Sequence, residues 1–147
     1  MRAISGLFFL LLAGRAGALG CNITTTPIGF GNYESSSVFA LDATADVNVN
    51  CDASVPYLVR LDAGENSAGT FSPRKMLLAG GSDAMNYNLY RNASRSEIWG
   101  DGTNGSFIQS GAGTGAGVQL PVYGRLFGAQ NVGAGTYLDN ITVTIEW

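Results

Sequence analysis

The sequence predicts an all-β protein with an immunoglobulin-like sandwich fold, and three observations favour it. Apolar and polar residues alternate with a period of two along residues 137–147, as in a strand with one buried face. The rest of the chain divides into short apolar segments separated by clusters of Gly, Asn, Asp and Ser, and no segment sustains a helical period. Two cysteines, Cys21 and Cys51, lie early in the chain, as a disulfide between the first strands requires.

The C-terminal segment is the clearest strand. Five apolar residues share one parity: Tyr137, Ile141, Val143, Ile145 and Trp147. The intervening residues Thr142, Thr144 and Glu146 are polar, and β-branched and aromatic side chains suit a half-buried sheet. A strand of this kind needs neighbours on both edges, so the source of its neighbours is the functional question.

The other elements follow in chain order. We expect strands at residues 22–26, 38–51, 57–62, 84–91, 118–125 and 136–147. Seven of the eighteen residues from 100 to 117 are glycine, which predicts a flexible surface loop. A phosphate-binding loop is disfavoured there, since no helix follows and no lysine is present.

Residues 1–20 are predicted to be a secretory signal peptide, followed by a single domain at 21–147. Arg2 precedes an apolar run at 7–13, and Ala16 to Ala18 offer an A-x-A cleavage site. Cleavage after Gly20 is also open. The run is too short to span a bilayer, which needs about 20 apolar residues. Alternatives are a stable N-terminal helix and a lipoprotein acylated at Cys21, although Ala18 stands where a lipoprotein signal has leucine.

Charge and cysteine content limit the partners and the compartment. Loss of Arg2 and Arg15 with the leader leaves six basic and eleven acidic residues, a net charge of −5. This balance disfavours binding to nucleic acid or to an anionic membrane. Behind a signal peptide, Cys21 and Cys51 are expected to form a disulfide in an oxidising compartment, and two free buried thiols are the alternative.

Catalytic and metal-binding chemistry has little support in the sequence. The chain has no histidine, the commonest general base and metal ligand. A hydrolase with two carboxylates is the remaining enzymatic option, and the carboxylate pairs Asp42 with Asp46 and Asp62 with Glu65, together with Asp101, are better explained as turn residues. We therefore expect no enzyme, no metal and no cofactor. The Asn-x-Ser/Thr motifs at Asn22, Asn92, Asn104 and Asn140 are expected to arise by chance in a chain rich in these residues.

Taken together, several short motifs resemble the spore coat protein U domain family, whose members include subunits of archaic chaperone-usher pili. The motifs begin with Cys21, Phe30-Gly31-Asn32-Tyr33, Cys51, Pro56-Tyr57-Leu58-Val59-Arg60-Leu61-Asp62-Ala63-Gly64 and Arg74-Lys75-Met76. They continue with Tyr87-Asn88-Leu89-Tyr90-Arg91, Ile98-Trp99-Gly100-Asp101-Gly102, Val122-Tyr123-Gly124-Arg125 and Gly135-Thr136-Tyr137-Leu138-Asp139. Each motif is weak by itself, whereas their order and spacing over nearly the whole of 21–147 are specific.

The resemblance implies a sandwich that lacks its last strand and has an apolar groove beside the C-terminal strand. A periplasmic chaperone fills such a groove first. A strand from another pilus subunit then replaces it at the outer-membrane usher, by β-augmentation. The expected site residues are Tyr137, Ile141, Val143, Ile145 and Trp147, and the expected location is the periplasm and then the cell surface, in a fimbrium or coat.

One departure from the family bears on the role of the subunit. Rod subunits carry a donor segment before the first cysteine, whereas at most Leu19 and Gly20 precede Cys21 after leader removal. We therefore expect a terminal or tip subunit, or a coat protein. The alternative is a self-contained secreted sandwich that binds carbohydrate or surfaces through Tyr90, Trp99 and the glycine-rich segment.

Overall fold

The computed structural model describes residues 19–147 and, for residues 2–12, the course of the backbone. The strands are β1 (Arg2–Leu12), β2 (Cys21–Thr25), β3 (Ile28–Tyr33), β4 (Leu41–Cys51), β5 (Pro56–Leu61), β6 (Arg74–Leu78), β7 (Ala84–Tyr90), β8 (Gln109–Ala112), β9 (Gly117–Leu126) and β10 (Tyr137–Glu146). Within the described ranges no α-helix occurs, and so none that could cross a membrane. The all-β prediction is confirmed.

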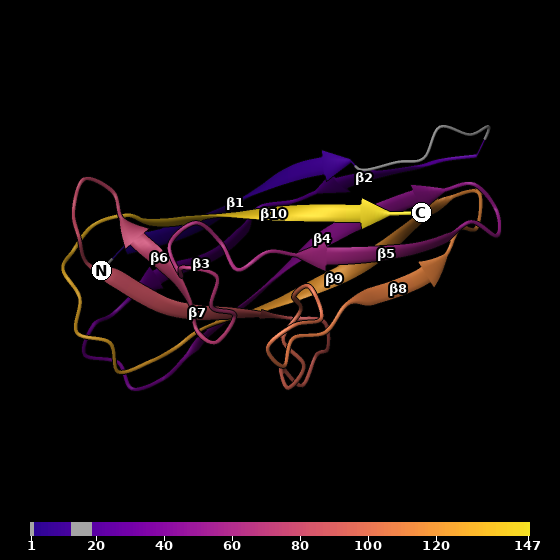
Figure 1. Cartoon of the computed structure of the whole chain (residues 1–147). Helices are drawn as coiled ribbons and strands as arrows, with labels where there is room; N and C mark the ends of the chain where they lie inside the picture. The colour runs from indigo at the N-terminus through magenta and orange to yellow at the C-terminus, as the bar shows by residue number, and fades with distance from the viewer. Residues whose placement is uncertain (1, 13–18) are drawn as a thin grey trace.

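The strands form an elongated sandwich (Figure 1). Their hydrogen-bonded order is β2-β4-β9-β7-β6-β10-β1-β3, with β5 also pairing β10 and β8 pairing β5. The strand order folds over between β7 and β6, which gives two layers. β3 lies in one layer and packs against β9 and β7 in the other. Phe30 of β3 makes an edge-to-face contact with Tyr87 of β7, with ring centroids 6.2 Å apart. Only the β1–β10 ladder is parallel among the described pairs.

One apolar core lies between the two layers. Alternate residues of the long strands supply it, which is why period-two patterns predicted these strands. Val47 and Val49 of β4 and Val143 and Ile145 of β10 are at most 1% exposed.

The six strands expected from the sequence are present, with ends shifted by up to three residues. Strands β3, β6 and β8 were not expected, and β1 lies within the predicted signal peptide. The predicted cleavage motif at 16–18 lies outside the described residues.

The prediction of a flexible loop over residues 100–117 is wrong in its second half. Residues 109–112 form β8, which pairs with β5 from Val59 to Pro56. Gly113 then passes so close to β4 that an added Cβ would lie 2.0 Å from the carbonyl oxygen of Asp52. Glycine is needed here for close approach of two backbones as well as for turns.

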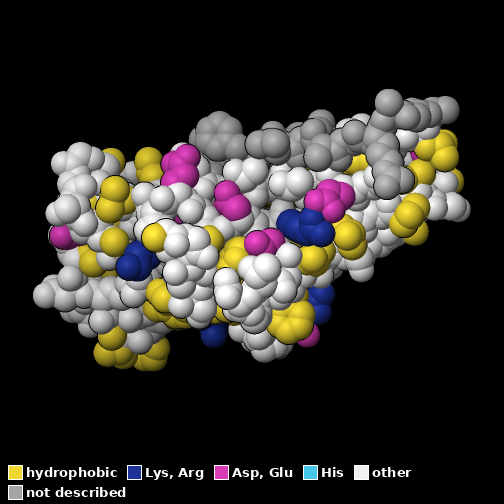
Figure 2. Space-filling model, viewed as in Figure 1, with side chains coloured by type: hydrophobic (Ala, Val, Ile, Leu, Met, Phe, Trp, Pro, Cys, Tyr) yellow, Lys and Arg dark blue, Asp and Glu magenta, His cyan; other side chains and the backbone are white. Residues whose placement is uncertain are grey.

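Charged side chains are scattered over the face seen in Figure 2, where acidic and basic residues form small separate spots. Arg60 of β5 and Glu146 of β10 make an ion pair across neighbouring strands. This face offers no continuous basic area of the kind that nucleic-acid binding requires.

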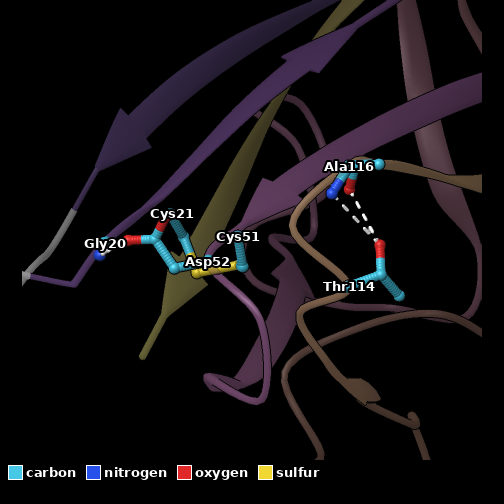
Figure 3. Close-up of a disulfide and its surroundings, with 6 residues drawn as sticks. All are labelled: Gly20, Cys21, Cys51, Asp52, Thr114 and Ala116. Atoms are coloured by element: carbon cyan, nitrogen blue, oxygen red, sulfur yellow. Dashed lines mark hydrogen bonds between the residues drawn. A yellow bond between two sulfur atoms is a disulfide. The ribbon is translucent and has the colours of Figure 1, made fainter.

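The predicted disulfide between Cys21 and Cys51 is confirmed. It joins β2 to β4 at directly paired positions (Figure 3). Beside it, the backbone N–H of Gly20 donates to Asp52 Oδ2 at 2.8 Å, and the Asp52 N–H donates to the Gly20 carbonyl at 3.1 Å. The start of the domain is therefore fixed covalently and by hydrogen bonds.

Candidate functional site

A position one strand wide lies between β10 and β3, and we call it the acceptor groove. It is bounded by the edge of β10 (Tyr137–Ile145) that pairs with β1 and by β3 (Ile28–Tyr33). In the full chain β1 occupies it, beside β10 in Figure 1. β1 runs parallel to β10 from the Ile4–Tyr137 pair to the Leu12–Ile145 pair, and antiparallel to β3 from Arg2–Tyr33 to Gly6–Ile28.

The β10 wall of the groove has strand partners besides β1. The opposite edge of β10 pairs with β5 from Val143 to Glu146 and with β6 at Tyr137 and Leu138. Four of the predicted site residues are almost fully buried, with 0 to 2% of their surface exposed: Tyr137, Ile141, Val143 and Ile145. The structure therefore brings these residues together along the floor of the groove.

Trp147, the fifth predicted site residue, follows the end of β10 and is partly buried. Its side chain packs against the edge of the apolar core. Its indole N–H is shielded from solvent and finds no hydrogen-bond acceptor among the described residues. Trp147 therefore marks one end of the groove rather than its floor.

The β3 wall is held by side-chain packing. Among the described strands, β3 has no ladder partner besides β1. Ile28 and Phe30 pack over Gly124 of β9, where an added Cβ would lie 2.5 Å from Ile28 Cδ1. At the end of β3, the Tyr33 hydroxyl accepts from the backbone N–H of Gln130 at 2.7 Å. These contacts hold β3 one strand spacing beyond the occupant, so the groove has room for a single strand.

A buried carboxylate interrupts the apolar floor. Asp139 of β10 lies between Tyr137 and Ile141 on the buried parity and is 2% exposed. It accepts hydrogen bonds from the Tyr87 hydroxyl, the Glu65 backbone N–H at 3.0 Å and Asn66 Nδ2 at 2.9 Å. Burial raises the pKa of Asp139 above its usual 3.8, and the hydrogen bonds from Tyr87 and Glu65 oppose this rise.

The predicted surface contacts at Tyr90 and Trp99 are wrong. Trp99 is 0% exposed, and its indole N–H donates to the Val59 carbonyl at 3.0 Å inside the sandwich. Tyr90 is 8% exposed. Trp99 is part of the apolar core. Tyr90 is covered on the other parity of β7 from Tyr87 and Leu89, so neither ring is available as a surface contact.

In the described part of the chain, no group of three or more His, Cys, Asp or Glu residues gathers that could hold a metal ion. Asp101, proposed as a turn residue, accepts from the Thr103 N–H at 2.9 Å and from its hydroxyl at 2.6 Å. This is an Asx turn, which uses the carboxylate locally.

Sequence reasoning missed the second wall of the groove. The segment of β3 entered only as one of the family motifs, although Ile28 and Phe30 alternate with glycines. That period of two was the available signal. Asp139 was also missed as a site residue, because a single carboxylate on an apolar parity resembles a turn residue.

The family model of the Spore Coat Protein U domain matches residues 8–144. Protein U of Myxococcus xanthus is 29% identical over 145 residues, a match that covers 91% of this chain and 79% of that protein.

Among solved structures, one similar chain belongs to the CsuC-CsuE chaperone-tip adhesion subunit pre-assembly complex from archaic chaperone-usher Csu pili of Acinetobacter baumannii. The TM-score is 0.60 at 21% identity, and the match covers 88% of this chain. This chain spans 40% of the length of that one. A likeness at this identity shows a shared fold.

Proposed function

Because the chain belongs to the Spore Coat Protein U domain family, we propose that it is a structural subunit of a surface appendage or coat. It takes part in assembly by accepting a β-strand from a partner into the acceptor groove. The role is structural rather than enzymatic.

The observation that carries this proposal is that the groove is one strand wide and that each of its walls has contacts of its own. β10 also pairs with β5 and β6, and β3 packs over Gly124, so each wall has contacts besides those to the strand between them. An incoming strand would gain backbone hydrogen bonds on both edges and would place alternate side chains over Tyr137, Ile141, Val143 and Ile145. Main-chain bonding supplies affinity, and the alternate apolar positions set the register.

The proposed partners follow from the family and from the similar solved complex. They are a periplasmic chaperone, an outer-membrane usher and other subunits of the same fibre or coat. Export through the predicted signal peptide at residues 1–20 would deliver the domain at 21–147 to the periplasm. The Cys21–Cys51 disulfide supports this route, since disulfides form in oxidising compartments.

The place of the subunit in a fibre is a finer proposal. If cleavage follows Ala18 or Gly20, two residues or none precede Cys21 in the processed chain. A donor strand needs several alternating residues, so the processed chain would accept a strand without donating one, as a terminal subunit does. Mixing it with a rod subunit tests this: mass spectrometry of a cross-linked pair in which residues 19–20 lie in the neighbour's groove would contradict it.

The acceptor function is tested with a chain that begins at Leu19. We expect this chain to aggregate or to melt broadly, because the edge of β10 and its apolar floor are open. A peptide with apolar residues at alternate positions should convert it to a monomer and raise its melting temperature by roughly 5 °C or more. A control peptide has the same composition without alternation. A soluble, cooperatively melting monomer without any peptide would sink the proposal.

The alternative of a self-contained carbohydrate-binding sandwich has no supporting observation. Its predicted contact residues Tyr90 and Trp99 are buried, and β8 occupies part of the glycine-rich segment that it requires at the surface.

A further inference from the structure

We propose that residues 2–12 act as an internal donor strand in the unprocessed chain, and that leader cleavage is the step that opens the acceptor groove. The segment then has two uses: it directs export and it blocks premature assembly. This inference rests on the proposed function, because a blocked groove matters only if the groove accepts a strand.

The length of the segment matches the groove. The β1 ladder with β10 extends from Ile4 to Leu12 and covers the strand from Tyr137 to Ile145. On its other edge the same segment pairs with β3 from Arg2 to Gly6, through one register shift between Ile4 and Ser5. One segment thus supplies partners to two strand edges, which removes the unpaired N–H and C=O groups that an open edge presents.

The register also matches the floor. Ile4, Phe8, Leu10 and Leu12 stand level with the four buried apolar residues of β10: Tyr137, Ile141, Val143 and Ile145. Gly6, the smallest residue, stands level with Asp139, the polar interruption of the floor. The order of apolar and small residues in β1 therefore follows the order of apolar and polar residues in β10.

The β1 residues of the other parity fit their neighbours in β10 less well, so another strand could replace β1. Leu7, Phe9 and Leu11 stand level with Asn140, Thr142 and Thr144, which are only half-buried. A strand built solely as a donor would carry polar residues at these levels, as β10 does. Residues 2–12 instead combine an export segment, which is apolar throughout, with a donor strand, which needs alternation, so they complement the groove imperfectly.

Cleavage changes the occupancy through effective concentration. While residues 13–20 connect β1 to Cys21, the groove meets its occupant at an effective concentration on the order of millimolar. After cleavage the segment is a separate peptide, present only at its bulk concentration. A partner strand with better alternation then wins the groove. The match to the family model begins at residue 8, inside β1, which supports treating this segment as part of the domain's sheet.

The test uses the full chain 1–147, synthesised without export so that the leader stays attached. The variant F8D/L10D places charges at levels of the buried floor, and the matched control L7D/F9D places them at the half-buried levels. Both variants lower the hydrophobicity of the leader similarly. We measure amide hydrogen exchange in residues 137–147 and the fraction of soluble monomer.

Wild-type chain and L7D/F9D should protect these amides, whereas F8D/L10D should exchange them about tenfold faster or more. If F8D/L10D aggregates, selective aggregation of this variant supports the proposal equally. Equal behaviour of the two double variants, in either readout, would overturn it.

The two proposals fail differently. An open, unstable chain from Leu19 together with no difference between the leader variants would remove only the present inference. A stable, closed chain from Leu19 would remove the proposed function as well.

Discussion

Arg74 brings a guanidinium into the interior of the sandwich, where it is 0% exposed. Its Nε and Nη2 donate to the Asp62 carbonyl at 3.0 and 2.6 Å, Nη2 also donates to the Trp99 carbonyl at 2.7 Å, and Nη1 donates to Asn88 Oδ1 at 3.0 Å. The planar group thereby connects three separate segments, and its loss would leave the Asp62 and Trp99 carbonyls without this donor. Asn88 Oδ1 would keep the hydrogen bond from the Leu89 N–H.

The variant R74M should therefore lower the free energy of unfolding by about 3 kcal/mol or more, since two carbonyls lose this donor at once. The neighbouring K75M is the matched control, because Lys75 lies on the exposed parity of β6 and its loss should change stability by about 0.5 kcal/mol at most. Urea unfolding of the full chain measures both. Equal stabilities of the two variants would contradict this role of Arg74.

Asp139 should give the protein an unusual pH dependence. Burial raises the pKa of this carboxyl above 3.8 in the folded state, so between 3.8 and the raised value the folded chain holds a proton that the unfolded chain has released. Stability from this group therefore falls as the pH rises through that window, by about 1.4 kcal/mol for each pH unit that the window spans. Below 3.8 both states are protonated, and the contribution no longer changes with pH.

The variant D139N should lack this dependence, and urea unfolding from about pH 3 to 7 would show the wild-type stability falling relative to it. Asp42 provides a control of opposite sign, because the hydrogen bond from Arg125 lowers the pKa of the Asp42 carboxyl. The stability that Asp42 contributes is lost as the pH falls. A wild-type curve parallel to that of D139N would show that Asp139 is not held protonated by burial.

At the level of the elements, the contact of β3 with β9 supports the second wall. An added Cβ at Gly124 would lie 2.5 Å from Ile28 Cδ1 and 2.8 Å from Phe30 Cζ. G124A should lower the free energy of unfolding by about 1 to 3 kcal/mol through overpacking, and should speed amide exchange in β3. Gly117 of the same strand has no atom within 4 Å of its added Cβ, so G117A should leave both quantities nearly unchanged. Equal exchange in the two variants would exclude this packing as the support of β3.

Local pattern predicted β10 and β4 because each strand has one face in the core and one toward solvent, so its periodicity is visible in a single segment. Strand β6 was not predicted because its apolar and polar residues do not alternate cleanly. Arg74, a charged residue, holds a buried position, so the apolar alternation that continues at Met76 is broken at its first residue. Strand β8 consists of Gln109–Ala112 in a glycine-rich context, and pairing with β5 alone makes it a strand.

Part of the candidate site could also be predicted from local sequence pattern, and part could not. Tyr137, Ile141, Val143 and Ile145 were predicted because the floor of the groove is a local pattern. The pairing of β1 with β10 connects residues more than one hundred positions apart, and the uninterrupted apolar run at 7–13 has no period to indicate a strand. Non-local pairing of this kind leaves no mark in a short window of sequence.

Over the whole molecule, the covalent bond and β1 lie at different positions in the hydrogen-bonded strand order. The disulfide joins β2 to β4, at the end of the strand order opposite to β1 and β3. The two ends of this order come together in space, because β2 contacts β1 and β10 while β4 contacts β3, so the bond supports strands of both layers.

Reduction should consequently weaken the whole fold without selecting the groove. The bond closes a loop between residues 30 positions apart, which in the chain-entropy model stabilises the folded state by about 3 to 4 kcal/mol. C21A/C51A should show this loss in urea unfolding of the full chain, and dithiothreitol should destabilise the wild type but leave C21A/C51A unchanged. In native-state hydrogen exchange, β2 and β4 should lose protection at least as much as β10. A selective loss in β10 would show that the disulfide and the acceptor groove are coupled.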